Sequence, residues 1–291
     1  MSVLESLPPG TNDITRRFRR GVPRGWQFRV GVAALALTCL IAFLGPFVAP
    51  HSTSAILGRP FGAPDAVALL GYDVLGRDVL SRLLSGGVTI VTMATAAAFI
   101  GTVSGAVIGL IAASSSSKVD AVIMRCLDVI LAFPTIVLAL LFVAVFGPNP
   151  VLIVCIVGLG HLPSVARIVR GAASNIVSRD FVLWAKSIGM PGTVVVIREV
   201  LPNIISPLMV EFGLRLMWSV GSISALSFLG YGIQPPAADW GLMVSENKSA
   251  LSQQPLSVVA PIFAIAVFTI GANLVAEGIA RHVARTEGRS R

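Results

Sequence analysis

The stretch DFVLWAKSIGMPGTVVVIREVLPN, residues 180–203, separates two strongly apolar spans and is rich in chain breakers. Asp180 can cap a helix by accepting backbone hydrogen bonds, and Gly189 can end it in a left-handed turn. Four residues between them recur at i, i+3, i+4 and i+7 and therefore share one helical face: Phe181, Trp184, Ala185 and Ile188. Beside membrane-crossing spans, a short helix with such a face needs a partner, and a groove in another protein is the usual one.

The composition indicates that the flanking spans lie in lipid. Of the 291 residues, 55% are apolar and 12% are charged, and the mean hydropathy is +0.85. A soluble domain of this length could not bury so much apolar surface. Six segments are long enough to cross a bilayer core as helices, at about 1.5 Å per residue: 30–48, 87–113, 121–146, 151–169, 204–229 and 257–277. The expected fold is an all-α membrane protein with six transmembrane helices.

The basic residues predict the orientation. Most of the 22 Lys and Arg residues precede the first span, follow the last span or border the second and fourth inter-span loops. By the positive-inside rule, both termini and the 170–203 loop are cytoplasmic. Because these charges border apolar spans and form no contiguous basic domain, the basic pI does not indicate nucleic-acid binding. Residues 16–29 either lie on the inner leaflet as an interfacial segment or form a cationic tail.

The same pattern divides the chain into regions. A basic leader, 1–29, precedes a first helix that is too long for the apolar part of a cleavable signal and is expected to be a retained anchor. Residues 49–86 are expected to form an extracytoplasmic segment with a short amphipathic helix. A five-helix core, 87–280, then contains the cytoplasmic coupling loop 178–203, and a cytoplasmic tail, 281–291, follows.

Charged and polar residues inside the spans are candidates for function. Glu211 and Arg215 stand at i, i+4 in the order that favours pairing. They either line a path for a polar substrate or form a salt bridge that fixes the rotation of the helix. His161 is expected to pack while bonded to a backbone carbonyl freed by Pro163, the alternative being a proton relay.

Small residues mark a close helix contact. Gly101, Gly105 and Gly109 recur every fourth residue of the second span, so three positions without side chains share one face. Such a face allows another helix to approach closely in lipid, either in this chain or in a partner.

A motif on the extracytoplasmic side follows the first span. The segment LLGYDVLGRDVLSRLLSGG, residues 69–87, is expected to form a turn and then the short amphipathic helix. Its leucines and valines would face the bilayer or the bundle, and Arg77, Asp78 and Arg82 would face water or a docking protein.

A second extracytoplasmic motif follows the fifth span. The segment LSFLGYGIQPPAADWGLMV, residues 226–244, is stiffened by Pro235 and Pro236 and places Trp240 at the level of the membrane interface. Gln234 lies in the same segment. Together with Arg77, Asp78, Arg82 and Trp240, it is expected to cover the mouth of a pore, to dock a binding protein, or both.

The chain lacks motifs for chemistry of its own. It has no GxxxxGK[ST] phosphate-binding loop and no nucleophile–base constellation, and its cysteines and histidines lack metal-ligand spacing. It is therefore expected to be non-catalytic, with no cofactor or metal of its own.

The three motifs resemble those of one family. Residues 180–203 resemble the EAA loop of ABC importer permeases at Ala185, Gly189, Leu201 and Pro202, while Leu183 and Trp184 stand where that pattern has Glu and Ala. The two extracytoplasmic motifs resemble signatures of the C-type subunit in the dipeptide/oligopeptide branch of type I ABC importers. They match at Gly71, Asp73, Gly76, Arg77, Asp78, Ser81 and Arg82, and at Ser227, Phe228, Leu229, Gly230, Gly232, Gln234, Pro235, Pro236, Trp240 and Gly241.

This resemblance implies a function and a set of partners. It implies a permease subunit in the bacterial cytoplasmic membrane that moves di- to oligopeptides inward by alternating access, or the related permease for nickel or another small solute. The partners would be membrane lipid, a second homologous permease subunit in a heterodimer, an extracytoplasmic substrate-binding protein, and two nucleotide-binding domains, on one or two chains, that bind ATP and Mg. The contact with the ATPase would lie on Phe181, Trp184, Ala185, Ile188 and Gly189. A secondary transporter would need coupling carboxylates or paired broken helices, and a structural scaffold would not need the coupling loop.

Overall fold

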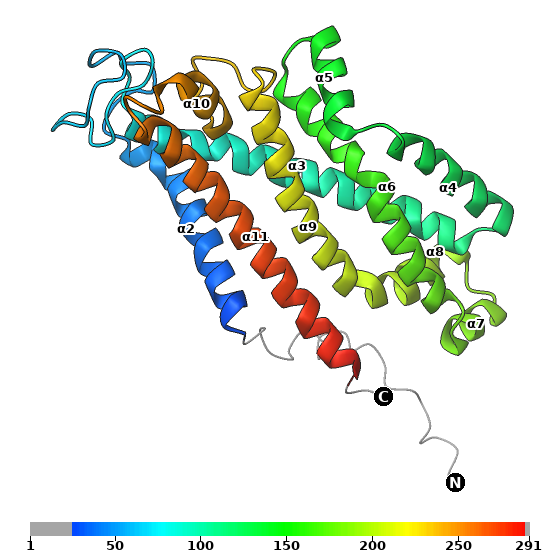
Figure 1. Cartoon of the computed structure of the whole chain (residues 1–291). Coiled ribbons are helices and arrows are strands. Elements are labelled where there is room, and N and C mark those ends of the chain that lie inside the picture. Colours follow the sequence, from blue (N-terminus) through cyan, green and yellow to red (C-terminus); the bar gives the residue numbers. More distant parts are fainter. Residues whose placement is uncertain (1–24, 289–291) are drawn as a thin grey trace.

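The computed structural model describes residues 25–288, so most of the predicted basic leader and the end of the predicted tail lie outside the described part. Within it the chain is helical apart from loops and two isolated backbone bridges. The elements follow in this order (Figure 1): α2 (Trp26–Val48), α3 (Val79–Ser114), α4 (Ser117–Leu131), α5 (Thr135–Phe146), α6 (Pro150–Val177), α7 (Asp180–Ser187), α8 (Gly192–Val195), the π-helical turn η1 (Val196–Val200), α9 (Leu201–Phe228), α10 (Trp240–Asn247), the 3₁₀ turn η2 (Lys248–Ala250) and α11 (Leu256–Gly288).

Five helices of the described part are long and apolar enough to cross a membrane: α2, α3, α6, the continuous stretch Gly192–Phe228, and α11. The remaining predicted span, 121–146, is a bent pair in which α4 and α5 meet at 72°. Pro134 accounts for the break, because it has no N–H to donate and disfavours the helical conformation at Phe133. The expectation of one uninterrupted third helix is therefore wrong, and the described chain has five spans, or six if the bent pair crosses as one.

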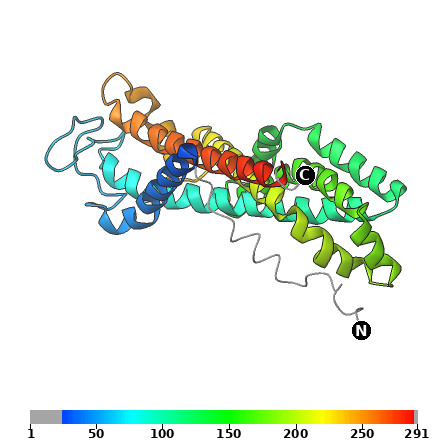
Figure 2. The same ribbon diagram turned by 90° about the horizontal axis from the view of Figure 1, so that it is seen from below.

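Helix α3 runs along α6 through the bundle (Figures 1 and 2). The glycine face of α3 lies in this contact: a Cβ added at Gly101 would stand 2.6 Å from the carbonyl oxygen of Gly158, and one at Gly109 would stand 2.5 Å from that of Ala166. Real Cβ atoms do not come so close, so only glycine permits this helix separation. The predicted close contact is confirmed, and its neighbour is a helix of the same chain.

The bundle has two distinct ends. Segment 49–78 and α10 lie at one end, and α7 lies at the other, with the start of α2 and the end of α11 (Figure 1). We call residues 49–78 together with residues 229–255 the cap.

The short amphipathic helix expected within 49–86 does not exist as a separate element. Residues 79–86 form the first turns of α3, which begins after Asp78 and continues without a break. Gly86 and Gly87 do not interrupt it because they pack against α10: a Cβ at Gly87 would stand 2.7 Å from the Trp240 ring. The helix that contains the second predicted span therefore begins at Val79 and not at residue 87.

Candidate functional site

Helix α7 ends as its sequence predicts. Gly189 has φ +82° and donates its N–H to the carbonyl of Lys186, while Met190 donates to Ala185 at 3.2 Å. This is the left-handed turn that satisfies the last carbonyls of a helix. At the other end the N-cap is Arg179, and Asp180 is the first helical residue without a side-chain capping bond. Asp180 therefore acts through its charge near the positive end of the helix dipole, and not as the predicted cap.

The two faces of α7 differ sharply in burial. Val182 and Ala185 are buried against Val195 of α8, with Ile176 of α6 and Met190 beside them. The opposite face is exposed and apolar: Phe181, Leu183, Trp184 and Ile188 have exposed fractions of 40%, 51%, 65% and 55%. Trp184, Phe181 and Ile188 are thus available to a partner as expected. Ala185 is not available to a partner, because it packs with Val182 and Val195 on the buried face of α7. Leu183 is exposed instead.

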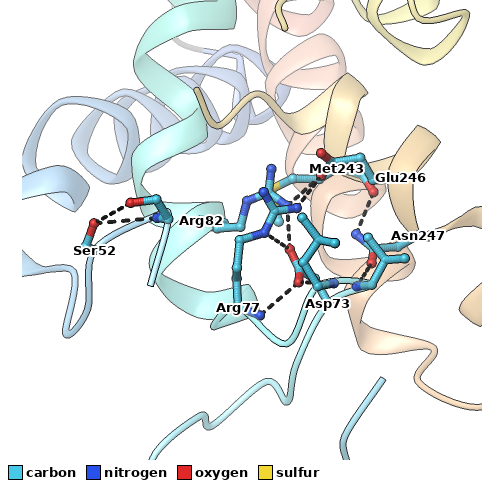
Figure 3. A network of polar contacts seen from close by, with 10 residues as sticks. Ser52, Asp73, Arg77, Arg82, Met243, Glu246 and Asn247 are labelled. Carbon is cyan, nitrogen blue, oxygen red and sulfur yellow. Dashed lines mark hydrogen bonds and ion pairs between the residues drawn. The ribbon is translucent and has the colours of Figure 1, made fainter. Parts of the chain in front are cut away.

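A buried ion cluster holds the cap together (Figure 3). Asp73 Oδ2 accepts hydrogen bonds from Arg77 Nε and from Arg82 Nη1, both at 2.6 Å. Glu246 Oε2 of α10 accepts hydrogen bonds from Arg82 Nη1 at 2.6 Å and from Arg77 Nη2 at 3.0 Å. Two arginines and two carboxylates therefore balance in charge, which is what makes such deep burial tolerable.

The cluster overturns one expectation. Arg77, Asp78 and Arg82 have exposed fractions of 3%, 1% and 0%, so they do not face water or a docking protein. The reason is that α10 lies over them and supplies the compensating Glu246, 169 residues from Arg77 in sequence. Asp78 serves instead as the N-cap of α3, accepting from the N–H groups of Leu80 and Ser81.

Helix α10 is fixed by its first residues. Asp239 is its N-cap and accepts from the N–H of Leu242 at 3.0 Å. Burial raises the pKa of Asp239, while the N–H of Leu242, the Ser227 hydroxyl and the N–H of Gly241 oppose that rise. Trp240 is fully buried and donates its indole N–H to the carbonyl of Leu83 at 2.8 Å, so its side chain is covered by this chain and not exposed to lipid or to a docking protein.

Gln234 differs from the other cap residues named by the sequence. Its side chain is exposed and donates to the carbonyls of Gly230 and Gly232. It is the residue among those predicted for docking or closure that remains on the cap surface.

A polar stripe runs along α9 inside the bundle. Glu211 accepts from Arg215 Nη2 at 2.9 Å and from Arg215 Nε at 3.2 Å, and Glu211 is only 6% exposed. Two helical turns from Glu211, the Ser219 hydroxyl meets His161 Nε2 of α6 at 3.0 Å. The expected carbonyl partner of His161 is therefore replaced by a serine from another helix. Glu211 and Arg215 therefore form the ion pair that their spacing predicts.

Metal ligation finds no support in the described residues. Between residues 25 and 288, no group of three or more His, Cys, Asp or Glu side chains is arranged to hold a metal ion.

Comparisons with known proteins identify the family of this chain. Residues 105–287 match the family described as "Binding-protein-dependent transport system inner membrane component". The chain is 34% identical, over 92% of its own length and 88% of the relative, to the glutathione transport system permease protein GsiD of Shigella dysenteriae serotype 1. It is 32% identical to that of Pectobacterium atrosepticum, over 86% and 85% of the two chains.

A third relative carries a different substrate in its name. It is a Brucella suis biovar 1 protein provisionally named a peptide transport system permease, 31% identical over 89% of this chain and 88% of the relative. The family match includes α6 to α10 and nearly all of α11, and these relatives align over 86–92% of the chain. The chain belongs to the binding-protein-dependent transport system inner membrane components, the multi-pass permease subunits of ABC importers.

Proposed function

We propose that this chain is the permease subunit of an ATP-driven importer for peptides in the bacterial cytoplasmic membrane. The observation that carries the proposal is the similarity along nearly the whole chain to permeases named for glutathione, itself a tripeptide, and for peptides. None of the three relatives is named for nickel or another inorganic solute, so that alternative is not favoured.

In the proposed orientation, both termini and α7 lie in the cytoplasm and the cap lies outside. The chain itself is non-catalytic. ATP and Mg are bound by two partner nucleotide-binding domains, a second homologous permease completes the heterodimer, and a binding protein delivers peptide at the cap.

The contacts of α7 with α6 and α8 would allow it to transmit a movement of the ATPase to the membrane spans. An ATPase groove would receive the exposed Phe181, Leu183, Trp184 and Ile188. The buried face of α7 packs on residues of α6 and α8, and α8 continues through η1 into α9. Closure of the ATPase dimer would therefore move the ends of two spans together and bias the pathway between two states of access.

The test is to purify the assembly with its partners and measure ATP hydrolysis with glutathione and with di- to hexapeptides. Peptide-stimulated hydrolysis that requires the binding protein is expected. Recovery of the full assembly without stimulation by any peptide would retain the family and reject the substrate class. Recovery of this chain without ATPase subunits would reject the proposed role of α7.

A further inference from the structure

Asp180 lies on the exposed face of α7, in the first turn of the helix. It precedes Trp184 by four residues, and Ile188 follows Trp184 by four, so the three side chains form one row along the helix. All three are exposed, whereas Val182 and Ala185 on the opposite face are buried. The row therefore belongs to the surface that α7 offers to a partner, at the end of the bundle remote from the cap (Figure 1).

The carboxylate of Asp180 has no partner within residues 25–288. It takes part in none of the ion pairs of that region and makes no capping hydrogen bond to the backbone of α7. Arg179 and Lys186 are the nearest cations in sequence, and both are exposed and form no ion pair with a described residue. Lys186 stands two residues after Trp184, and residues two apart on a helix do not face each other. The exposed row thus carries one negative charge that nothing in the described chain neutralises.

The other side chains of this face carry no charge. Ser187 donates its hydroxyl to the carbonyl of Trp184 at 2.8 Å, and Leu183 is apolar at the position where the EAA pattern has Glu. A groove that buries Trp184 also covers Asp180, because the two residues are only about 6 Å apart along the helix axis. Removing an unpaired carboxylate from water is costly, so such a groove must supply a cation at Asp180.

From these observations we infer that the ATPase groove that receives α7 contains an arginine that binds Asp180; the inference rests on the proposed function, which assigns α7 to the ATPase contact. A planar guanidinium donates two parallel hydrogen bonds to a carboxylate, which a lysine ammonium cannot do. It also stacks on aromatic rings, and Phe181 and Trp184 follow Asp180 by one and four residues. An arginine therefore matches both the charge and the aromatic surface of this face.

The ion pair fixes how α7 lies in the groove. Apolar burial is not directional, so Trp184 and Ile188 alone would allow α7 to rotate or slide against the ATPase. A charged pair at the start of the helix sets its register, because a displaced α7 would leave the carboxylate and the arginine buried apart. Movement of the ATPase then reaches α7 along a defined direction.

The experiment measures how fast the ATPase subunits dissociate from the intact assembly, which is held in nanodiscs, immobilised through the permease and kept free of peptide. Asp180→Asn keeps the size of the side chain and removes its charge. It should raise the dissociation rate about tenfold or more, as expected for the loss of one partner of a desolvated ion pair. Asp180→Glu keeps the charge and should restore most of the wild-type rate. An unchanged rate in Asp180→Asn would overturn the inference.

Lys186→Gln is the matched control for the stability of α7. Asp180 in the first turn and Lys186 in the last turn both interact favourably with the helix dipole, so removing either charge weakens the helix by a similar amount. Lys186 lies off the exposed row, and Lys186→Gln should therefore dissociate at the wild-type rate. Equal acceleration by both variants would overturn the inference, because the effect would then come from the helix and not from an ion pair.

A charge exchange tests the identity of the partner residue. Asp180→Arg should dissociate faster than Asp180→Asn, because it places two cations together. Replacing one arginine of the ATPase groove by aspartate should restore slow dissociation in the Asp180→Arg assembly, which is the coupling expected of residues in contact. Failure of every such replacement, or recovery only when a lysine is replaced, would overturn the assignment of an arginine.

Trp184→Ala, measured in the same way, separates this inference from the proposed function. If Trp184→Ala accelerates dissociation and Asp180→Asn does not, the ion pair is absent while the ATPase contact stands. If neither variant does so, α7 is not the ATPase contact and both proposals fail. The measurement uses no peptide, so it does not depend on the substrate class.

Discussion

Gly189 has a backbone that the neighbouring residue types cannot adopt cheaply. Its φ is +82°, and a Cβ placed there would meet nothing within 4 Å. The requirement for glycine is therefore purely conformational, since space is available. This separates Gly189 from Gly101 and Gly109, where the α3–α6 contact excludes a side chain by distance.

Replacement of Gly189 by valine is expected to destabilise the end of α7 by about 1–2 kcal/mol, the cost of a left-handed residue with a Cβ. The purified assembly should lose coupling of ATP hydrolysis to substrate while still inserting in the membrane. Gly192→Ala is the control, because Gly192 is equally unobstructed and has no positive φ. Unchanged coupling in Gly189→Val would contradict the role assigned to this turn.

Arg82 illustrates how a buried charge depends on its partners. Its Nη1 binds both Asp73 and Glu246, while its Nε and Nη2 have no partner among the described residues. Arg82→Met should cost about 3–5 kcal/mol of stability, because it leaves two buried carboxylates with one arginine.

The double variant Arg82→Met with Glu246→Leu should recover part of that loss, since it removes one charge of each sign and keeps the Arg77–Asp73 pair. Denaturation of the purified assemblies measures both steps. Simple additivity of the two single losses would refute the charge-balance account.

The raised pKa of Asp239 predicts how the stability of the protein changes with pH. Burial raises its pKa above the ordinary 3.8, so the folded protein holds the proton more tightly than the unfolded chain does. The contribution of Asp239 to the free energy of unfolding is then largest below pH 3.8. It falls as the pH rises through the pKa that Asp239 has in the folded protein.

Asp239→Asn should keep the cap of α10, because asparagine also caps helices well, and should remove this pH dependence. Unfolding midpoints of both proteins between about pH 4 and pH 8 test it. The variant should be at least as stable as wild type at pH 8, with the difference shrinking toward pH 4. A constant difference across the range would show that Asp239 does not titrate as argued.

At the scale of elements, α7 combines a fixed inner face with an open outer one. Its eight residues could not form a stable helix alone. The contacts of Val182 and Ala185 with Val195 stabilise it and leave its larger apolar side chains exposed. An exposed aromatic residue on a rigid support is the arrangement found at energetically dominant interface positions.

Trp184→Ala should therefore weaken ATPase binding by about 2 kcal/mol and lower coupled hydrolysis, without changing thermal stability of the permease. Trp26→Ala is a matched control, since Trp26 is 72% exposed at the start of α2, away from α7. Wild-type substrate-stimulated hydrolysis in Trp184→Ala would falsify the contact.

At the scale of the whole molecule, the cap and α7 lie at opposite ends of the bundle, which the proposed orientation places on opposite sides of the membrane. The cap is joined by hydrogen bonds between distant segments, such as Gln254 Nε2 to the carbonyl of Leu70 at 2.8 Å and the Val74 N–H to Asn247 at 2.9 Å. These bonds make the first and last inter-span loops one unit, remote from α7.

The proposed orientation is testable with single cysteines in a chain whose Cys39, Cys126 and Cys155 are replaced by alanine. A membrane-impermeant thiol reagent should label Leu57→Cys in intact cells and Ser178→Cys only after permeabilisation; Leu57 and Ser178 are both exposed, and Ser178 lies outside the proposed ATPase contact. The reverse pattern would invert the topology.

The sequence by itself determined the features that depend on neighbours within one or two helical turns. Apolar length placed the spans, the glycine repeat marked the α3 contact face, and the Gly189 turn ended α7 where a left-handed residue is possible. The i, i+4 spacing likewise predicted the Glu211–Arg215 pair as one of two alternatives.

Only the tertiary structure decided the features that depend on distant partners. Helical periodicity gave Arg77 and Arg82 a water-facing side, because nothing local could show that Glu246 would reach them. The same limit applies to Trp240, buried over α3, and to His161, which bonds to Ser219 of another helix. A charged or polar side chain is buried when a partner compensates its lost hydration, and folding of the whole chain supplies that partner.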